Sequence, residues 1–245
     1  MISVEPLGTV AIMRLDRASK KNALTPKMLA DLVACMDNAT SARAIVLSGV
    51  GDVFCAGFDL TLAQEDEDAT ASLLRGLAAA VRALREAPCP VVASAHGAAI
   101  AGGCALLCGC DIVITDDGAK LGYPAVRLGL SPAVSAPGLI AMMGAPGAAR
   151  ARLLDPGLVS GREAQRRGIA SECVPTATAC EARAIELATM LSEKPRSVMA
   201  YTKRWLNECD GSMDHARTEP ALEASLASIL TSEHKELLAA SWARK

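Results

Sequence analysis

The stretch AIAGGCALLCGCDI, residues 99–112, decides how this chain is interpreted. It carries adjacent glycines at positions 102 and 103, three cysteines within seven positions, and no charged side chain before Asp111. Three interpretations are open. The stretch could be a metal site built from thiols, part of a membrane segment, or a turn whose chemistry comes from backbone groups.

The cysteines do not have the spacing of a metal site. Cys104, Cys108 and Cys110 follow a C-x3-C-x-C pattern, which is unlike the usual zinc spacings, and no histidine follows within reach. The nine cysteines of the chain are odd in number, and the N-terminus lacks the apolar core of a secretory signal. We therefore expect free, mostly buried thiols in a reducing cytoplasm, with neither disulfides nor a bound metal.

Residues 88–110 are free of charge over a length that could span a membrane. The run is interrupted, however, by Pro88, Pro90 and His96. Its first part, PVVASAHG at residues 90–97, is rich in β-branched residues and ends in a turn signal, as a buried strand does. We expect a soluble protein without a membrane segment.

The composition and charge of the chain argue against binding to nucleic acid. The chain has 245 residues, of which 51% are hydrophobic but only 2% aromatic, so its core is expected to consist of Ala, Val, Leu and Ile. With 25 basic and 27 acidic residues the net charge is −2. Such a balance gives no electrostatic reason to expect binding to nucleic acid.

Hydrophobic patterns predict strands and helices in alternation. Residues 4–16 alternate like a hairpin with Gly8 at its turn, and Val10, Ile12 and Leu15 are expected on one face. Thr25, followed by a proline, is expected to cap a helix over residues 26–39. Further strands are expected at 42–51, 90–97 and 111–115, and further helices at 71–86 and 102–110.

The predicted helix at 71–86 is amphipathic. Leu73, Leu77, Ala80 and Leu84 recur at helical spacing, while its arginines lie elsewhere around the axis. From about residue 136 onward the pattern is helical, and no Ser/Gly/Pro-rich linker separates a second domain. We expect one spiral α/β core over residues 1–190, followed by a helical region over residues 191–245.

Two glycine turns are the strongest candidate site. Gly102 and Gly103 fall between a buried strand and a helix start, where backbone N–H groups lack partners and the helix dipole is positive. CAGFDL, residues 55–60, is a second turn after a second strand. Two N–H donors from the two turns could converge on one developing oxyanion, although such turns can also be simple connections.

Two other polar groupings are weaker candidates. Ser94 and His96 have no evident orienting acid, so we expect a structural role for His96. The acidic run at residues 65–68, with Glu65, Asp66 and Asp68, could supply a general base if it folded over a pocket. A solvated loop is the simpler interpretation of that run.

Five motifs, in order along nearly the whole chain, resemble the crotonase (enoyl-CoA hydratase/isomerase) superfamily. LDRASKKNALTPKML is similar to the family's N-terminal signature, VFCAGFDL to its first oxyanion-hole turn, and AHGAAIAGGCALLCGCDI to its second. KLGYPAVRLGLSPAVSAPGLIAMMG resembles the strand and helix that follow, and GREAQRRGIASECVP a late helix and turn.

The resemblance implies a crotonase-like spiral of ββα units with a C-terminal helical trimerisation region. Homo-oligomers of three or six chains are implied, acting on acyl-CoA thioesters in fatty acid metabolism. Coenzyme A would be part of the substrate, and no permanently bound cofactor is expected. Carried over by position, the backbone N–H groups of Phe58 and Gly102 form the oxyanion hole. One such donor contributes about 3–4 kcal/mol to stabilising a transition state.

The resemblance also implies residues that bind coenzyme A. In the first motif they are Lys20, Lys21 and Ala23, at the nucleotide end. Ala56, Asp59 and Leu60 would lie where the pantetheine passes. Lys235 is a further candidate for a phosphate contact, on the same or on a neighbouring subunit. All of these stay expectations from the resemblance.

The chain departs from the family where hydratases carry their two catalytic glutamates. Those positions are Ala105 and Ala125 here, and a later aspartate used by some relatives is Ala133. Alanine cannot transfer a proton, and a positioned acid or base contributes about 10²–10⁴-fold. Ordinary hydratase activity through these positions is therefore not expected.

Two functions are then open. The first is an enzyme (a lyase, an isomerase or a thioester hydrolase) with another proton-transfer group, for which Tyr123 is the main candidate. Arg127, Ser131 and Ser135 are close to it in sequence, and we expect Arg127 to pair structurally. The second is a catalytically silent acyl-CoA-binding member of the family. A polar group near the thioester would favour the enzyme and an apolar pocket the binder.

Overall fold

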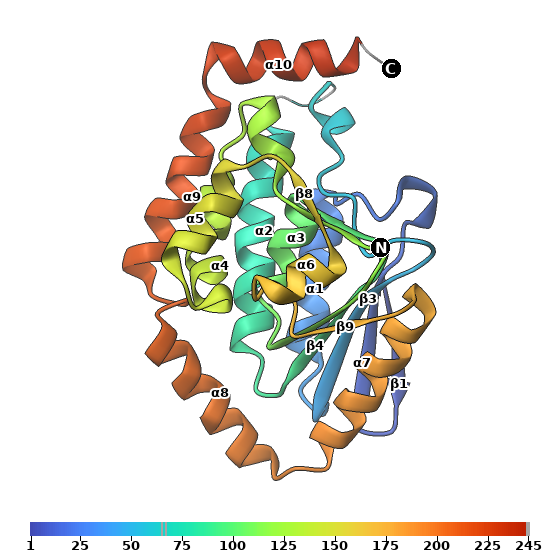
Figure 1. The fold of residues 1–245 in the computed structure, drawn as a ribbon. Coiled ribbons are helices and arrows are strands. Elements are labelled where there is room, and N and C mark those ends of the chain that lie inside the picture. The colour runs from blue at the N-terminus through green and yellow to red at the C-terminus, as the bar shows by residue number, and fades with distance from the viewer. Residues whose placement is uncertain (65, 67, 244–245) are drawn as a thin grey trace.

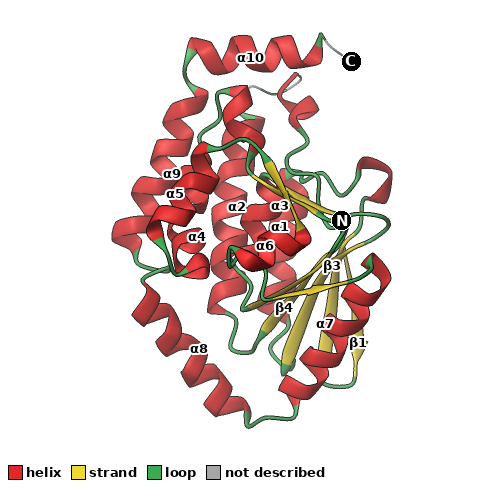
Figure 2. Ribbon diagram, in the orientation of Figure 1, coloured by secondary structure: helices red, strands yellow, loops and turns green. Residues whose placement is uncertain are grey.

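In the computed structural model, which describes residues 1–64, 66 and 68–243, a six-stranded sheet lies in the lower right of the view in Figures 1 and 2. Its strand order is β1-β2-β3-β4-β6-β9. β1 and β2 are antiparallel, and the other neighbouring pairs are parallel. The strands are β1 (Ile2–Leu7), β2 (Val10–Leu15), β3 (Ala44–Gly49), β4 (Val91–Ala95), β6 (Ile112–Asp116) and β9 (Glu172–Val174).

A second, three-stranded sheet gives the fold its spiral form. β5 follows β4, β7 follows β6, and these two short strands pair in parallel, while β8 adds antiparallel to β7. Isolated bridges from Cys55 to Ala99 and from Leu24 to Phe58 continue the same layer. The recurring order of long strand, short strand and helix is that of ββα units. The short strands are β5 (Ala98–Ile100), β7 (Lys120–Gly122) and β8 (Leu158–Ser160).

Helices cover both faces of the six-stranded sheet (Figure 1). α7 packs on one face, over an apolar cluster that includes Val46, Val92 and Ile114. The opposite face is covered by α1, α2 and α3 over a larger cluster. The helices are α1 (Pro26–Asn38), α2 (Ala69–Glu86), α3 (Gly102–Leu107), α4 (Ala136–Met143), α5 (Pro146–Leu154), α6 (Gly161–Arg166), α7 (Ala177–Ser192), α8 (Arg196–Asp210), α9 (His215–Ile229) and α10 (Ser232–Trp242).

Four 3₁₀ turns complete the described secondary structure: η1 (Ala18–Lys20), η2 (Leu60–Gln64), η3 (Pro124–Leu128) and η4 (Pro132–Ser135).

The predicted N-terminal elements are confirmed, with one correction. Leu7 pairs with Val10 across the hairpin turn, and the Thr25 hydroxyl accepts the N–H of Met28 at 3.1 Å to cap α1. Leu15, however, does not share a face with Val10, because side chains alternate along a strand. Leu15 lies in the cluster under α1 and α2, and Val10 in the cluster under α7.

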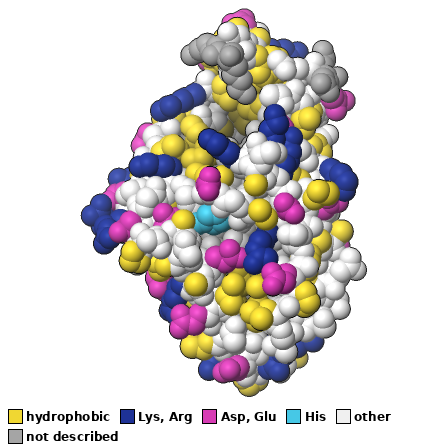
Figure 3. Space-filling view, turned by 90° about the vertical axis from the view of Figure 1, so that its right-hand side faces the viewer, with side chains coloured by type: hydrophobic (Ala, Val, Ile, Leu, Met, Phe, Trp, Pro, Cys, Tyr) yellow, Lys and Arg dark blue, Asp and Glu magenta, His cyan; other side chains and the backbone are white. Residues whose placement is uncertain are grey.

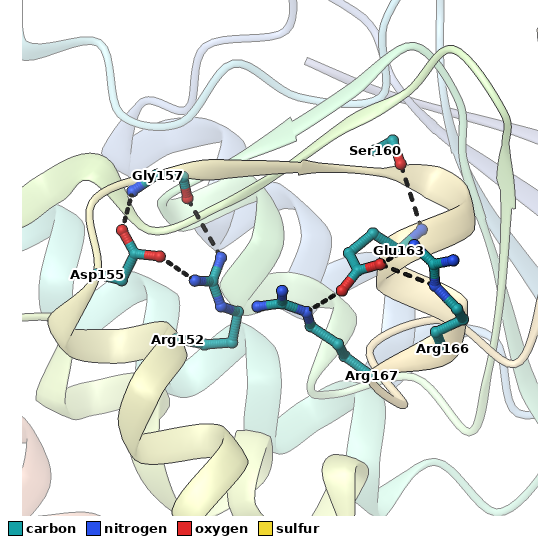
Figure 4. Close-up of polar contacts among 7 residues, drawn as sticks. All are labelled: Arg152, Asp155, Gly157, Ser160, Glu163, Arg166 and Arg167. Atoms are coloured by element: carbon teal, nitrogen blue, oxygen red, sulfur yellow. Dashed lines mark hydrogen bonds and ion pairs between the residues drawn. The ribbon is translucent and has the colours of Figure 1, made fainter.

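The sequence pattern predicts a helical C-terminal half, but this half also contains two short strands. β8 and β9 are strands of three residues each, too short to show alternation, and only their pairing with β7 and β6 reveals them. Between α5 and α6 the chain is held by polar contacts (Figure 4). Arg152 pairs with Asp155, which also accepts the N–H of Gly157 at 2.8 Å, and Glu163 pairs with Arg166 and Arg167.

α8 is attached to the core through polar side chains. Lys203 is buried, and its ammonium lies 2.7 Å from Asp111 Oδ2 and donates to the carbonyls of Leu84 and Cys89. Asp210 reaches Arg85 at 3.4 Å, so this arginine of α2 is buried rather than exposed as its place on the helix suggests. The predicted boundary between residues 1–190 and 191–245 stays a prediction.

All nine cysteines are free thiols, six of them buried, as expected. Within the described ranges there is no group of three or more His, Cys, Asp or Glu side chains that could hold a metal ion. The same part of the chain contains no helix with both the length and the apolar character needed to cross a membrane.

Gly103 allows the two sheets to approach each other closely. A Cβ on Gly103 would lie 2.6 Å from the carbonyl oxygen of Cys55 and 2.7 Å from its Cβ, distances at which backbone must move. Gly103 therefore allows α3 to begin directly against the chain that follows β3. No larger residue fits without separating these two segments.

We expect Gly103→Ala to lower the free energy of unfolding by about 1–3 kcal/mol through overpacking. Chemical denaturation would measure the difference. Gly147→Ala is the matched control, because an added Cβ there meets nothing within 4 Å, and it should change stability by less than about 1 kcal/mol. Equal effects of the two substitutions would contradict the close-contact explanation.

Candidate active site

A cavity of about 310 Å³ lies where the two glycine turns meet. Its wall is formed by the turn after β3, one side of α2, the start of α3, and the η3 and η4 segments. Most of the lining side chains are apolar. Phe58, Leu60, Gly102, Ala105 and Ala125 all face this one cavity.

The two turns run parallel and side by side. Cys55 N–H donates to Ala98 O at 2.9 Å, and Ile100 N–H donates to Cys55 O at 3.0 Å. Continued in the same register, this pairing places Phe58 beside Gly102. Contact confirms it, because a Cβ on Gly102 would lie 2.8 Å from the Phe58 ring.

Two backbone donors at this place are unpaired. In the described structure, the N–H groups of Phe58 and Gly102 donate no hydrogen bond to another residue. Buried N–H groups are nearly always paired with protein or water. Two free N–H groups on adjacent turns, both lining a cavity, can therefore hold one acceptor oxygen of a ligand.

The backbone is strained next to one of these donors. Ala101 has φ +47° and ψ −110°, a combination that costs a non-glycine residue about 1–3 kcal/mol. Its own N–H donates to Gly122 O at 2.8 Å, which ties the turn to β7. The unfavourable torsion sets the direction of the peptide that carries the Gly102 N–H.

The segment with the two predicted nucleotide-binding lysines lies directly against the first turn. Ala56 N–H donates to Lys21 O at 3.0 Å, and Leu24 N–H donates to Gly57 O at 2.7 Å. Lys20 and Lys21 are exposed, and neither forms an ion pair with a described residue. Ala23 is half-buried and does not line the cavity.

Asn22 holds this segment in place, a role that its sequence position did not suggest. It is fully buried, accepts the N–H of Arg17 at 2.9 Å, and donates to the carbonyls of Val50 and Val53 at 2.9 Å each. Its φ of +55° is one that asparagine tolerates better than most residues. The side chain thus joins the end of β2 to the loop after β3.

Asp59 is buried and forms an ion pair rather than lining the cavity. Its Oδ2 lies 2.7 Å from Arg17 Nη1, and its Oδ1 accepts the Thr61 hydroxyl at 2.6 Å. Burial alone would raise the pKa of Asp59, but the hydrogen bonds from Thr61 and Arg17 outweigh it and lower the pKa below its ordinary value. Of the residues expected along the pantetheine, Ala56 and Leu60 do line the cavity.

Tyr123 contributes its ring to the cavity, while its hydroxyl is engaged elsewhere. The oxygen lies 3.5 Å from Cys108 Sγ, and the residue is 1% exposed. Burial, together with Cys104 and Cys108, raises the pKa of Tyr123 well above its ordinary value. A phenol held in this way is a poor base, and its predicted catalytic role stays a prediction.

The remaining polar residues of the cavity come from one wall. Arg127 is exposed and lines the cavity, and it has no ion pair among the described residues, contrary to the structural pairing expected from sequence. The Ser131 hydroxyl accepts the N–H of Ala133 at 3.3 Å. Ser135 is buried, and its hydroxyl has no partner within the described chain. Ala133 lies outside this cavity.

The weaker candidates lie apart from the cavity. His96 Nε2 lies 3.0 Å from Gly51 O and its ring is buried, a structural arrangement. Asp66 and Asp68 are exposed, with the Asp68 N–H bonded to Asp66 at 2.9 Å, and Glu65 lies outside the described residues. Lys235 is exposed on α10.

Comparison with known proteins gives consistent matches over most of the chain. A family model described as Enoyl-CoA hydratase/isomerase matches residues 5–237. The 2,3-dehydroadipyl-CoA hydratase of Escherichia coli is 28% identical over 89% of this chain and 83% of its own length. The probable enoyl-CoA hydratase echA6 of Mycobacterium bovis is 30% identical over 88% of this chain and 86% of its own.

A solved structure shows the same fold. The enoyl-CoA hydratase/isomerase of Xanthobacter autotrophicus superposes with a TM-score of 0.87 at 29% identity, covering 97% of this chain and 91% of that one. The likeness therefore extends over the spiral core and the C-terminal helices together.

The lowered pKa of Asp59 gives a pH-dependent prediction. Such a carboxylate stabilises the folded state above its unfolded pKa of about 3.9, and the contribution is lost as pH falls through the folded value. We expect Asp59→Asn to lower the free energy of unfolding at neutral pH by roughly 1.5–3 kcal/mol. The variant should also lose less stability than the native chain between neutral pH and about pH 3.

Denaturant unfolding at several pH values measures both effects. The control is Asp31→Asn, which removes the exposed pair of Asp31 with Lys27 on α1 and should cost about 0.5 kcal/mol or less. If Asp59→Asn kept the pH profile of the native protein, the assignment of the ion pair would be wrong.

Proposed function

Because the chain belongs to the enoyl-CoA hydratase/isomerase family, we propose that it binds the acyl thioester of coenzyme A in this cavity and polarises its carbonyl group. The thioester oxygen would accept hydrogen bonds from the N–H groups of Phe58 and Gly102. The single observation that supports this most is that both donors are unpaired, adjacent and on the cavity wall. Each would stabilise an enolate-like state by about 3–4 kcal/mol.

The surroundings suit the rest of the coenzyme. Lys20 and Lys21 are unpaired cations beside the first turn, where they can meet phosphate groups. The N-terminal segment that includes η1, dark blue in Figure 1, reaches the right-hand side of that view. Figure 3 views that side, and in its upper half Lys and Arg side chains lie around hydrophobic ones. A nucleotide phosphate and an apolar pantetheine arm need both kinds of surface.

The residues present favour a reaction that does not begin with removal of a proton. Ala105 and Ala125 line the cavity where hydratases of the family carry glutamates. Loss of CO₂ from a 2-carboxyacyl thioester needs no base. The electron pair of the breaking carbon–carbon bond moves into the thioester, the enolate oxygen is held by the two N–H groups, and water then protonates the α-carbon. We propose this decarboxylation as the first activity to test.

A silent acyl-CoA binder is the second candidate. The apolar wall favours it, since the Tyr123 hydroxyl is turned toward Cys108 and the catalytic glutamates are absent. In this case the protein would hold the thioester without turnover.

The two candidates separate in one set of assays. Calorimetry should show binding of both crotonyl-CoA and malonyl-CoA. Absorbance should show little hydration of crotonyl-CoA by the native chain, and at least about 10²-fold more by the Ala105→Glu/Ala125→Glu variant, because it regains an acid and a base. Loss of CO₂ from malonyl-CoA favours the decarboxylase, and binding alone favours the silent member. Fast hydration by the native chain would contradict both.

We also propose that the chain forms a homo-oligomer of three or six copies through α8. The usual arrangement of side chains is reversed in this helix. Lys203, Asn207 and Asp210 face the core, while Tyr201 and Trp205 are 73% and 68% exposed. Exposed aromatic side chains in a row are typical of interfaces. A second copy of the chain would cover them.

Trp205→Glu should reduce the assembly to monomers in light scattering coupled to gel filtration, because a charge would replace one of the two exposed aromatic side chains. Ala30→Glu adds the same charge at an exposed position of α1 and should leave the mass unchanged. A native protein that is already monomeric would exclude the proposal.

A further inference from the structure

Ser135 is a buried polar residue that nothing in the proposed function uses. It is the last residue of η4, it is only 6% exposed, and it lines the thioester cavity. Its hydroxyl forms no hydrogen bond within the part of the chain that the structure describes. Leu74, Leu77 and Val134 line the same cavity.

The hydroxyl is open to the cavity, because it is not among the described side-chain atoms that are fully enclosed without a partner. A ligand that fills the cavity covers it, and leaving it without a partner would then cost about 1–3 kcal/mol. The neighbouring serines differ, because Ser131 accepts the Ala133 N–H and Ser225 makes two hydrogen bonds. A ligand atom that pairs with the Ser135 hydroxyl would avoid this cost.

The backbone next to Ser135 is held in position by hydrogen bonds with α9. Ser225 of α9 is fully buried, and its Oγ accepts the Val134 N–H at 2.9 Å and donates to Ser131 O at 2.9 Å. Ser228 accepts the Ser131 N–H at 3.0 Å. The residue directly before Ser135 is thus fixed by α9, so the backbone that carries Ser135 is in place before any ligand arrives. Such preorganisation reduces the cost of binding.

Proton transfer is not the role that this placement supports. A nucleophilic or acid–base serine needs a base within hydrogen-bond reach, and no described side chain lies within that distance of the Ser135 hydroxyl. A neutral hydroxyl can instead donate or accept one hydrogen bond, which makes it a selector of oxygen-bearing ligands.

We propose that Ser135 determines specificity by hydrogen-bonding an oxygen atom on the acyl part of the substrate. This rests on the proposed thioester site and names the substrate class: acyl-CoA thioesters whose acyl chain carries a hydroxyl or carboxylate oxygen. A plain saturated or unsaturated chain leaves the hydroxyl unpaired and binds more weakly.

Calorimetry with matched thioesters tests this. Butyryl-CoA is the reference, and 2-, 3- and 4-hydroxybutyryl-CoA and malonyl-CoA each add an oxygen at a different place. We expect at least one of them to bind the native chain about 3–10-fold more tightly than butyryl-CoA, as one net hydrogen bond implies. Ser135→Ala should remove this preference and leave butyryl-CoA binding within about twofold.

Ser131→Ala is the matched control, since its hydroxyl serves the backbone, and it should keep the preference. Thermal unfolding gives an independent readout: Ser135→Ala should not destabilise the protein, because the removed hydroxyl has no partner. The assignment of Ser135 is overturned if the preference survives in Ser135→Ala, or if the native chain shows no preference. Binding of butyryl-CoA in either case would still support the thioester site. Failure of every thioester to bind overturns both.

Discussion

The close contact between the turn after β3 and the start of α3 is the constraint on which the rest of the structure depends. Gly103 lies where any Cβ would meet the backbone of Cys55, and Gly57, with φ +99°, meets Ile100 O in the same way. Because both segments can approach, the bridge between Cys55 and Ala99 forms and the second sheet begins. The same approach brings the N–H groups of Phe58 and Gly102 to one side of a cavity.

Around this contact, polar side chains hold segments that have little regular structure. Arg17 and Asn22 join the lysine-bearing loop to the first turn. On the opposite wall, His234 of α10 lies 2.6 Å from Leu128 O, and α9 fixes η4 through its serines. The apolar cavity is thus framed by hydrogen bonds lying behind its surface, which fix the wall and leave few polar groups facing the cavity.

This arrangement places the two backbone donors independently of the side chains at positions 105 and 125. The two backbone donors depend on main-chain geometry, which Gly103, Ala101 and Asp59 maintain. The side chains of Ala105 and Ala125 make none of these contacts and line the cavity instead. In the proposed function, polarisation of a thioester and proton transfer are therefore separate properties of the cavity.

The sequence alone determined the elements whose cause is local. Capping by Thr25, the hairpin at Gly8, the two glycine turns and the two alanines follow from neighbouring residues, and the motif order indicated the spiral fold. Only the tertiary structure decided which polar side chains face the cavity and which are paired elsewhere. Asp59 is engaged by Arg17, which lies 42 positions away. Tyr123 turns toward Cys108, and Ser135 is left without a partner. Hydrogen-bond partners distant in sequence meet only when the chain is folded, so no local pattern predicts whether a side chain will be paired or free.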